Sequence, residues 1–218
     1  MAKEETLPQP VSTMTAAQLA RRRRLTDAVI EMIDQVPPDQ LQMRDVAERS
    51  GVALGTAYRY FSSKDHLLAA AWADWHRRLT DRVRGEVSRD HSRSNSGPGT
   101  VPSAGACTRV VSFLHRELRA FQRHPNFARL VTHVEVASDP FASEELAGLA
   151  DDNRTVMAAL MNDVPPEVAR PATIAINATL ASGLVAWTAG RLTFPDLVRQ
   201  LEDVTRLVLG GYDDITAG

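Results

Sequence analysis

Apolar residues recur along most of the chain at three- and four-residue intervals, which is the spacing of one face of an α-helix, and the pattern contains no strand-like alternation. One stripe runs from Leu25 to Ile33 and is closed by Pro37-Pro38. Ser62, three residues before Asp65, forms a capping-box pattern that predicts the start of a longer helix. The pattern predicts an all-α protein of about nine helices, in which three small N-terminal helices and a long connecting helix precede a C-terminal bundle.

The composition of two segments sets the expected domain boundaries. Residues 1–14 contain two prolines and no periodic apolar pattern, so we expect a disordered arm there. Residues 88–106 are rich in Ser, Gly and Pro and predict a flexible loop. We therefore expect a helix-turn-helix domain over 15–66 and a larger helical domain over 67–218.

Residues 44–68 carry the most informative motif, two short helices around a glycine followed by the start of the long helix. Gly51 lies where the chain must reverse within a few residues, and glycine adopts a positive φ there without strain. The second short helix, from Leu54 to Phe61, is too polar for a core and too aromatic for an ordinary solvated face. This combination predicts a recognition helix of a DNA-binding protein.

Charge adds little to this prediction at the level of the whole chain. The net charge is −2, and residues 1–90 carry 14 Lys and Arg against 13 Asp and Glu, so no basic domain lies behind the motif. The cationic run Arg21 to Arg24 is a candidate for phosphate contact, although such a run can also be a solvated helix face.

Composition also excludes several classes of protein. The single cysteine, Cys107, rules out an internal disulfide framework and a Cys-x-x-Cys zinc site. No stretch approaches the roughly 20 uninterrupted apolar residues of a membrane span, and the N-terminus has no signal-peptide pattern, so we expect a cytoplasmic protein without a membrane partner.

An enzyme would need a nucleophile, paired carboxylates or a metal cluster. The sequence has no Gly-x-Ser-x-Gly elbow, no phosphate-cradling glycine loop and no His-Glu-x-x-His, and its six histidines are scattered. We expect no catalysis, no metal site and no cofactor.

The motif as a whole resembles the TetR family of bacterial transcriptional regulators. The resemblance runs from Arg44-Asp-Val-Ala through Gly55-Thr-x-Tyr-x-Tyr-Phe61 to Lys64-x-x-Leu67-Leu68. It implies that the N-terminal helices bind DNA, that residues 67–218 form a ligand-binding and dimerisation domain, and that a small molecule releases the DNA. Ala142-Ser-Glu-Glu and the segment 181–187 are also similar to the actinobacterial subgroup that represses sterol and lipid catabolism.

The resemblance assigns residues to DNA contact, in positions that reach a base edge or a phosphate. For Tyr58 and Tyr60 the alternative is that one ring completes the small core and only its hydroxyl reaches out. Gln42 and Pro37-Pro38 depart from the family pattern before the second helix. The candidate DNA-binding residues are Arg22, Arg23, Arg44, Leu54, Gly55, Thr56, Tyr58, Arg59, Tyr60 and Lys64.

Effector and dimer residues have no local sequence motif, and large groups on helical faces are more often core than pocket lining. Candidates for ligand contact are Trp75, Phe113, Phe121, Phe127, His133, Met157, Met161, Asn177 and Trp187. Candidates for the dimer interface are Leu184, Trp187, Leu197, Leu201, Val204 and Val208, and either of their stripes could instead be internal core.

The functional hypothesis is a ligand-responsive repressor, a homodimer that leaves an inverted-repeat operator in double-stranded DNA when a small apolar effector binds. A lipid, a steroid or an acyl thioester would suit such a pocket. The alternative is a DNA-binding regulator controlled by a protein partner or by no ligand.

Overall fold

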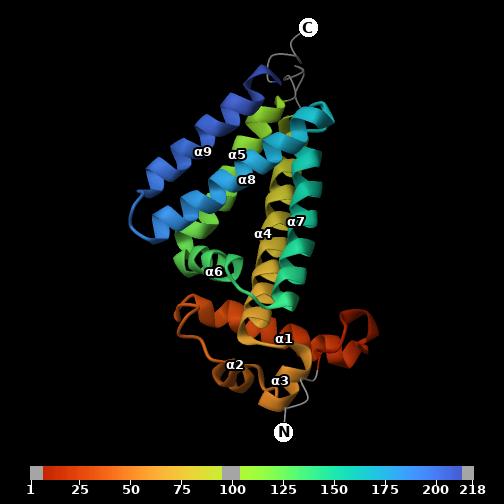
Figure 1. The fold of residues 1–218 in the computed structure, drawn as a ribbon. Helices are drawn as coiled ribbons and strands as arrows, with labels where there is room; N and C mark the ends of the chain where they lie inside the picture. Colours follow the sequence, from red (N-terminus) through yellow and green to blue (C-terminus); the bar gives the residue numbers. More distant parts are fainter. Residues whose placement is uncertain (1–6, 95–103, 213–218) are drawn as a thin grey trace. The chain divides into compact units, whose positions relative to one another are not determined.

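The computed structural model describes residues 7–94 and 104–212, and within them the chain forms nine α-helices and no strand, as the apolar pattern predicted (Figure 1). Short 3₁₀ turns lie at Val11–Thr13 and Gly210–Tyr212. The helices are α1 (Ala16–Ile33), α2 (Met43–Ser50), α3 (Leu54–Tyr60), α4 (Lys64–Ser94), α5 (Ala106–Arg123), α6 (Pro125–Glu135), α7 (Pro140–Leu160), α8 (Pro166–Thr188) and α9 (Phe194–Leu209).

The helices form two compact units, and two long helices contribute to both. Unit 1 comprises Met1–His76 and Pro125–Leu149, and unit 2 comprises Arg77–His124 and Ala150–Gly218. Unit 1 therefore holds α1 to α3, the first turns of α4, α6 and the first half of α7. Unit 2 holds the rest of α4 and α7 together with α5, α8 and α9.

Unit 1 is built on α1, whose capping box begins the helix. Thr15 accepts a hydrogen bond from the Gln18 amide, and the Gln18 side chain accepts one from the Thr15 amide (2.8 Å). Leu25 and Ile33 are fully buried on the face that packs against α2 and α3. Gly51 ends α2 at φ 65°, the left-handed conformation expected of the turn glycine.

Helix α6 packs into the same unit through polar and aromatic contacts. Phe127 stacks on Trp75 of α4 with ring centroids 4.2 Å apart, and the Asn126 side-chain amide donates to the Ile33 carbonyl at the end of α1 (2.8 Å). The carbonyl is one that the helix end would otherwise leave unpaired. The core of unit 1 therefore extends well beyond the helix-turn-helix.

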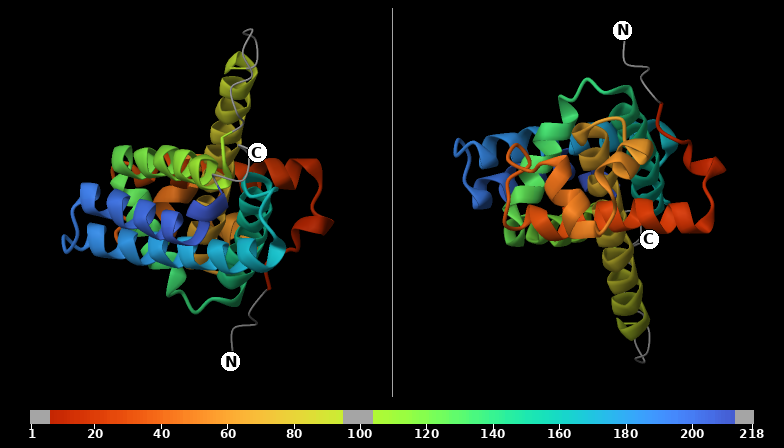
Figure 2. Two further views of the ribbon diagram at one scale, coloured as in Figure 1. Left: turned by 90° about the horizontal axis from the view of Figure 1, so that it is seen from above. Right: turned by 90° about the horizontal axis from the view of Figure 1, so that it is seen from below.

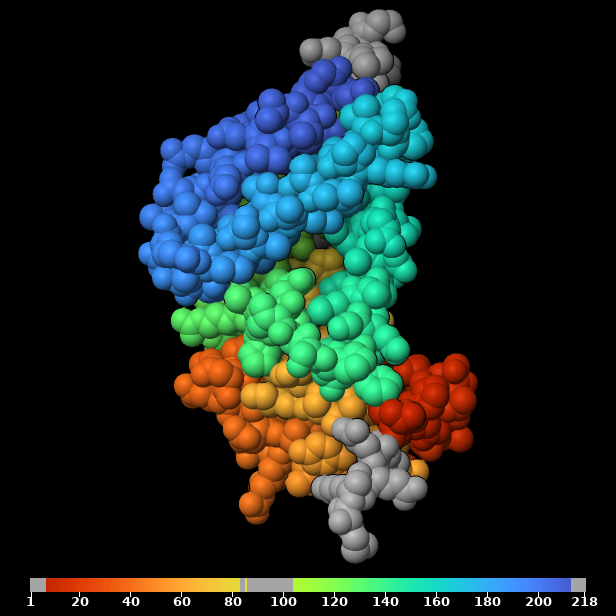
Figure 3. All heavy atoms as spheres, in the orientation of Figure 1, coloured from red at the N-terminus to blue at the C-terminus, as the bar shows by residue number. Residues whose placement is uncertain are grey.

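In unit 2, α9 lies alongside both α8 and α5 (Figures 1 and 2). Thr193 caps α9 as predicted, accepting from the Asp196 amide (3.3 Å). Gly183 permits a close approach of α8 to α9, since a Cβ at this position would lie 2.3 Å from Leu197 Cδ1. Figure 3 shows the side chains of α8 and α9, in blue, side by side on one face of this unit.

Helix α8 combines an apolar sequence with an exposed face. An 18-residue window of α8 has a mean hydropathy of 1.2, enough by length and composition for a membrane span, yet only 28% of that window is buried. Core and interface helices satisfy the same criteria. Ile174 on α8 and Leu207 on α9 are 70% and 84% exposed, so unit 2 presents apolar groups that it does not bury itself.

Three local predictions are corrected. Residues 7–14 are ordered rather than a disordered arm, and Pro8 and Met14 are buried. Helix α4 continues to Ser94 and so enters the segment 88–106, which was predicted to be a loop. Residues 1–6 and 95–103 lie outside the described residues. The side chain that caps α4 is Ser63, which accepts from the His66 amide (3.1 Å), whereas the Ser62 hydroxyl donates to Asp139, the residue before α7. The functional division at residues 66 and 67 remains a proposal.

Candidate nucleic-acid interface and effector residues

Helix α3, the predicted recognition helix, has one exposed and one buried face. Leu54 and Tyr58 are 37% and 46% exposed, and Gly55 and Arg59 are exposed beside them. A Cβ built on Gly55 would have no neighbour within 4 Å, so no packing inside the protein requires glycine here. The missing side chain instead lets another molecule approach the backbone from outside. The exposed face thus offers hydrogen-bond donors, an apolar tip and space for close approach, as groove recognition requires.

The basic residues nearby divide into exposed and internal ones. Arg44, in the first turn of α2, and Arg23 on α1 are exposed. Arg49 is also largely exposed and pairs with Glu31 at 3.0 Å across α2 and α1. Arg44 and Arg23 therefore keep the exposure that their predicted contacts with DNA need.

Two residues that were predicted to contact DNA make contacts inside the protein instead. Tyr60 is 3% exposed, which corresponds to the alternative in which its ring completes the core. Arg22 has a side chain only 14% exposed, and it pairs with Glu145 of α7 while its guanidinium carbon lies 4.8 Å from the Phe61 ring centroid. Both side chains are largely buried in unit 1, so these two predicted DNA contacts lack the exposure that the exposed candidates have.

Lys64 is partly committed to the protein as well. Its ammonium donates to the carbonyls of Pro38 and Asp39, each at 3.3 Å, and so holds the loop between α1 and α2. An ammonium has three donors, so a phosphate contact by Lys64 remains a prediction. Thr56 is half-buried on α3.

The contact between Arg22 and Glu145 belongs to a cluster that joins α7 to the turn after α3. The Ser62 amide donates to His66 Nδ1 (3.1 Å), and since a backbone amide only donates, the ring proton lies on Nε2, 3.8 Å from Glu145 Oε1. The Ser62 hydroxyl donates to Asp139 (2.8 Å), whose other carboxylate oxygen accepts from the amides of the first turn of α7.

This cluster shifts the pKa of both carboxylates downwards. Burial raises the pKa of Glu145, but the polar contact with His66 and the positive charge of Arg22 outweigh it and hold the pKa below its ordinary value. Burial likewise raises the pKa of Asp139, and hydrogen bonds from Ser63, Ser62 and two backbone amides lower it by more. Sequence reasoning missed Glu145 and Asp139, since their partners lie far away in the chain.

The candidate ligand residues fall into both units. Trp75, Phe127 and His133 belong to unit 1, where the two rings stack on each other and His133 Nε2 lies 2.9 Å from Asp65. The other six belong to unit 2. Asn177 and Trp187 are half-buried. The other four are at most 2% exposed and pack as core, namely Phe113, Phe121, Met157 and Met161.

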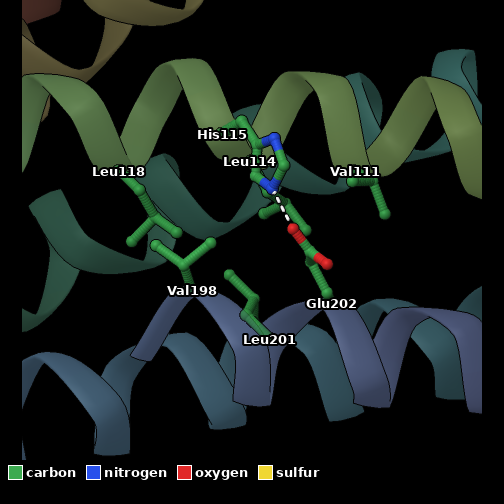
Figure 4. Close-up of a pocket in the computed structure, with 7 residues that line it drawn as sticks. All are labelled: Val111, Leu114, His115, Leu118, Val198, Leu201 and Glu202. Atoms are coloured by element: carbon green, nitrogen blue, oxygen red, sulfur yellow. Dashed lines mark hydrogen bonds and ion pairs between the residues drawn. The ribbon is translucent and has the colours of Figure 1, made fainter. Parts of the chain in front are cut away.

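A shallow pocket in unit 2 lies between α5 and α9 (Figure 4). Two of its lining residues interact, with His115 Nε2 lying 2.6 Å from Glu202. The pocket encloses no space for even a water molecule, so it is too small for a steroid or an acyl thioester. Of the residues predicted for the ligand or the dimer interface, Leu201 alone lines it.

The predicted dimer residues also divide. Leu184, Leu197 and Leu201 are at most 2% exposed and form internal core, so their assignment to the dimer interface is corrected. Trp187, Val204 and Val208 are half-buried. The exposed Ile174 and Leu207 were not among the residues predicted for the dimer interface, because sequence alone does not tell the inner stripe of a two-sided apolar helix from the outer one.

Comparisons with known proteins cover most of the chain. The family model described as "Bacterial regulatory proteins, tetR family" matches residues 25–71, and "Tetracyclin repressor-like, C-terminal domain" matches residues 105–208. The chain is 33% identical over 195 residues to the HTH-type transcriptional repressor KstR of Rhodococcus jostii, covering 89% of this chain and 85% of that protein.

Solved structures are similar as well. A TetR transcriptional regulator from Rhodococcus sp. RHA1 matches with a TM-score of 0.68 and 27% identity, over 88% of this chain and 96% of that one. The regulator FadR of Bacillus subtilis, solved in complex with stearoyl-CoA, matches with a TM-score of 0.62 and 17% identity, over 87% and 98% of the two chains.

Proposed function

The chain belongs to the TetR family of bacterial regulatory proteins, and from this premise we propose that it is a cytoplasmic repressor that leaves a palindromic operator when a small apolar effector binds. The observation that carries the DNA-binding part is the exposed face of α3, where Leu54, Gly55, Tyr58 and Arg59 lie together on one side of a helix whose other side is buried. Arg44 and Arg23 are exposed cations on α2 and α1, two helices that contact α3.

A homodimer is the form in which this face reads an inverted repeat. We assign the dimer interface to the outer faces of α8 and α9, because Ile174 and Leu207 are highly exposed and Trp187, Val204 and Val208 are only half-buried in the protomer. A two-fold axis through these helices would relate the recognition helix of one protomer to that of its partner. The two recognition helices need a spacing of roughly 34–36 Å, or a multiple of it, to enter successive major grooves.

For the effector we propose a lipid, a steroid or an acyl thioester. One support is the similarity to KstR repressors and to the actinobacterial subgroup that represses sterol and lipid catabolism. Another is the fold shared with FadR, which was solved with stearoyl-CoA. An effector shifts the protein away from DNA only if it binds the DNA-free state more tightly, by a factor of about 10 for each 1.4 kcal/mol of coupling.

The DNA-binding proposal is tested by mobility shift with an inverted repeat recovered from random-sequence selection. Wild-type protein should retain that repeat at a salt concentration that removes random DNA, and Arg44→Ala should relax the choice at one base pair by about 1–3 kcal/mol. Equal losses of Arg44→Ala on the repeat and on random DNA would contradict a base contact.

The effector class is tested by thermal unfolding with stearoyl-CoA and with cholesterol as probes. A true effector at 100 times its Kd adds about 2.7 kcal/mol of stability and should also displace the DNA. Stabilisation by neither probe, with intact operator binding, would favour control by a protein partner or by no ligand.

A further inference from the structure

The segment Leu7–Met14 crosses from the start of α1 to the end of the recognition helix. Its sequence Pro8-Gln9-Pro10 leaves Gln9 as the single residue between Leu7 and Val11 with a backbone N–H, since proline has none. That amide donates to the carbonyl of Arg59 in the last turn of α3, at 3.0 Å. The one backbone donor between Leu7 and Val11 therefore goes to the recognition helix.

Helix α3 has few caps of its own. It has only seven residues, Ala53 offers no side-chain hydrogen bond at its start, and Phe61 follows it in an extended conformation rather than a glycine turn. A helix this short is unstable without tertiary contacts, and the carbonyls of its last turn lack partners within the helix. The Gln9 amide supplies one of the missing partners.

The side chain of the same residue, Gln9, is fastened to α1. The side-chain amides of Gln9 and Gln18 pair reciprocally, with Gln18 Nε2 donating to Gln9 Oε1 at 2.9 Å and Gln9 Nε2 to Gln18 Oε1 at 3.5 Å. Gln18 is also part of the capping box of α1. The Thr13 hydroxyl donates to the Pro10 carbonyl (2.8 Å) and closes the 3₁₀ turn. Proline keeps φ near −65°, so little conformational entropy is lost when the segment orders.

We propose that residues 7–14 form a strap that caps the recognition helix and holds its exposed face in the orientation that reads the operator. The positioning group is the backbone amide of Gln9, which acts through Arg59 and itself contacts no DNA. This inference rests on the proposed DNA-binding function. One net hydrogen bond changes an equilibrium by about 2.3- to 10-fold, and two half-sites multiply this to about 5- to 100-fold on an inverted repeat.

The experiment compares two substitutions at one position in the full chain. Gln9→Pro removes the N–H, and its fixed φ suits the extended conformation that a residue before Pro10 prefers. Gln9→Ala is the matched control, because it keeps the N–H and removes only the side-chain pairing. We expect Gln9→Pro to lose about 5- to 100-fold in affinity for the repeat and less than about 2-fold for random DNA, and Gln9→Ala to keep most of its affinity.

A second measurement on the DNA-free protein separates the strap from the function. Amide hydrogen exchange at Tyr60 and Phe61 should accelerate by about 2- to 10-fold in Gln9→Pro, while the thermal midpoint stays that of the wild type. Unchanged exchange, or equal losses on both DNAs, would overturn the strap. Wild-type protein that prefers no inverted repeat would instead overturn the proposed function, even where the exchange result supports the strap.

Discussion

Replacing Arg22 by Gln should destabilise the protein without removing a phosphate contact, whereas the same change at the neighbouring Arg23 should do the opposite. Arg22 pairs with Glu145 and lies over the Phe61 ring, while Arg23 is exposed. The two variants change the same charge one residue apart on α1. They therefore separate an internal role from a surface role.

The size of the loss follows from how far the ion pair is removed from water. Breaking a fully buried pair costs about 3–5 kcal/mol, and an exposed pair contributes about 0–1 kcal/mol. The side chains of Arg22 and Glu145 are 14% and 20% exposed, so we expect about 2–3 kcal/mol for Arg22→Gln, including the contact with Phe61. In a chain of 218 residues this lowers the Tm by about 4–12 °C.

The assay combines urea unfolding with the salt dependence of operator binding. Each phosphate contact contributes about 0.9 to the slope of log K against log salt concentration. We expect Arg23→Gln to unfold like the wild type and to lower the slope, and Arg22→Gln to unfold earlier with the slope unchanged. Wild-type stability of Arg22→Gln together with a lowered slope would refute the internal role.

Three further predictions concern the buried carboxylate, the dimer interface and the contact between α8 and α9. The pKa of Glu145 is lowered in the folded protein, so the ionised carboxylate stabilises the fold above the ordinary pKa of 4.5, and this stabilisation is lost as the pH falls through the pKa of the folded state. Urea unfolding between pH 7 and 3 should show this loss of stability, and Glu145→Gln should lack this part of the pH dependence. Leu207→Glu should dissociate the dimer in sedimentation, whereas the same change at the 40% exposed Leu19 of unit 1 should not; a dimer unchanged by Leu207→Glu would place the interface elsewhere. Gly183→Val should cost about 1–3 kcal/mol in unfolding free energy through overpacking, and Gly148→Val, where a Cβ meets nothing within 4 Å, should avoid that overpacking; equal losses would contradict the close approach.

The elements with local signals were predictable from the sequence. The turn at Gly51 and the cap at Thr193 each depend on residues a few positions apart, and both have the expected geometry. The exposed face of α3 follows from the same local periodicity. Such features are fixed by backbone conformation and nearest neighbours, which a sequence displays directly.

The features that escaped prediction depend on partners distant in the chain. Arg22 is one of four consecutive arginines, which together span a whole helical turn and therefore point in all directions around α1. Which of them is internal depends on Glu145, which lies 123 residues later in the chain and pairs with Arg22. The order in residues 7–14 depends in the same way on the carbonyl of Arg59. In α9, both faces carry apolar groups, and packing on α8 and α5 decides that Leu201 is inside and Leu207 outside.

The central claim is that the exposed face of α3, repeated in a homodimer, reads an inverted repeat. The most direct measurement is footprinting of the purified wild-type protein on the sequence that it selects from random DNA. The account predicts two protected half-sites whose centres lie about 10 base pairs, or a multiple of that, apart, and loss of protection with Tyr58→Ala. Protection without a symmetric repeat, or binding to random DNA that is equally strong, would contradict it.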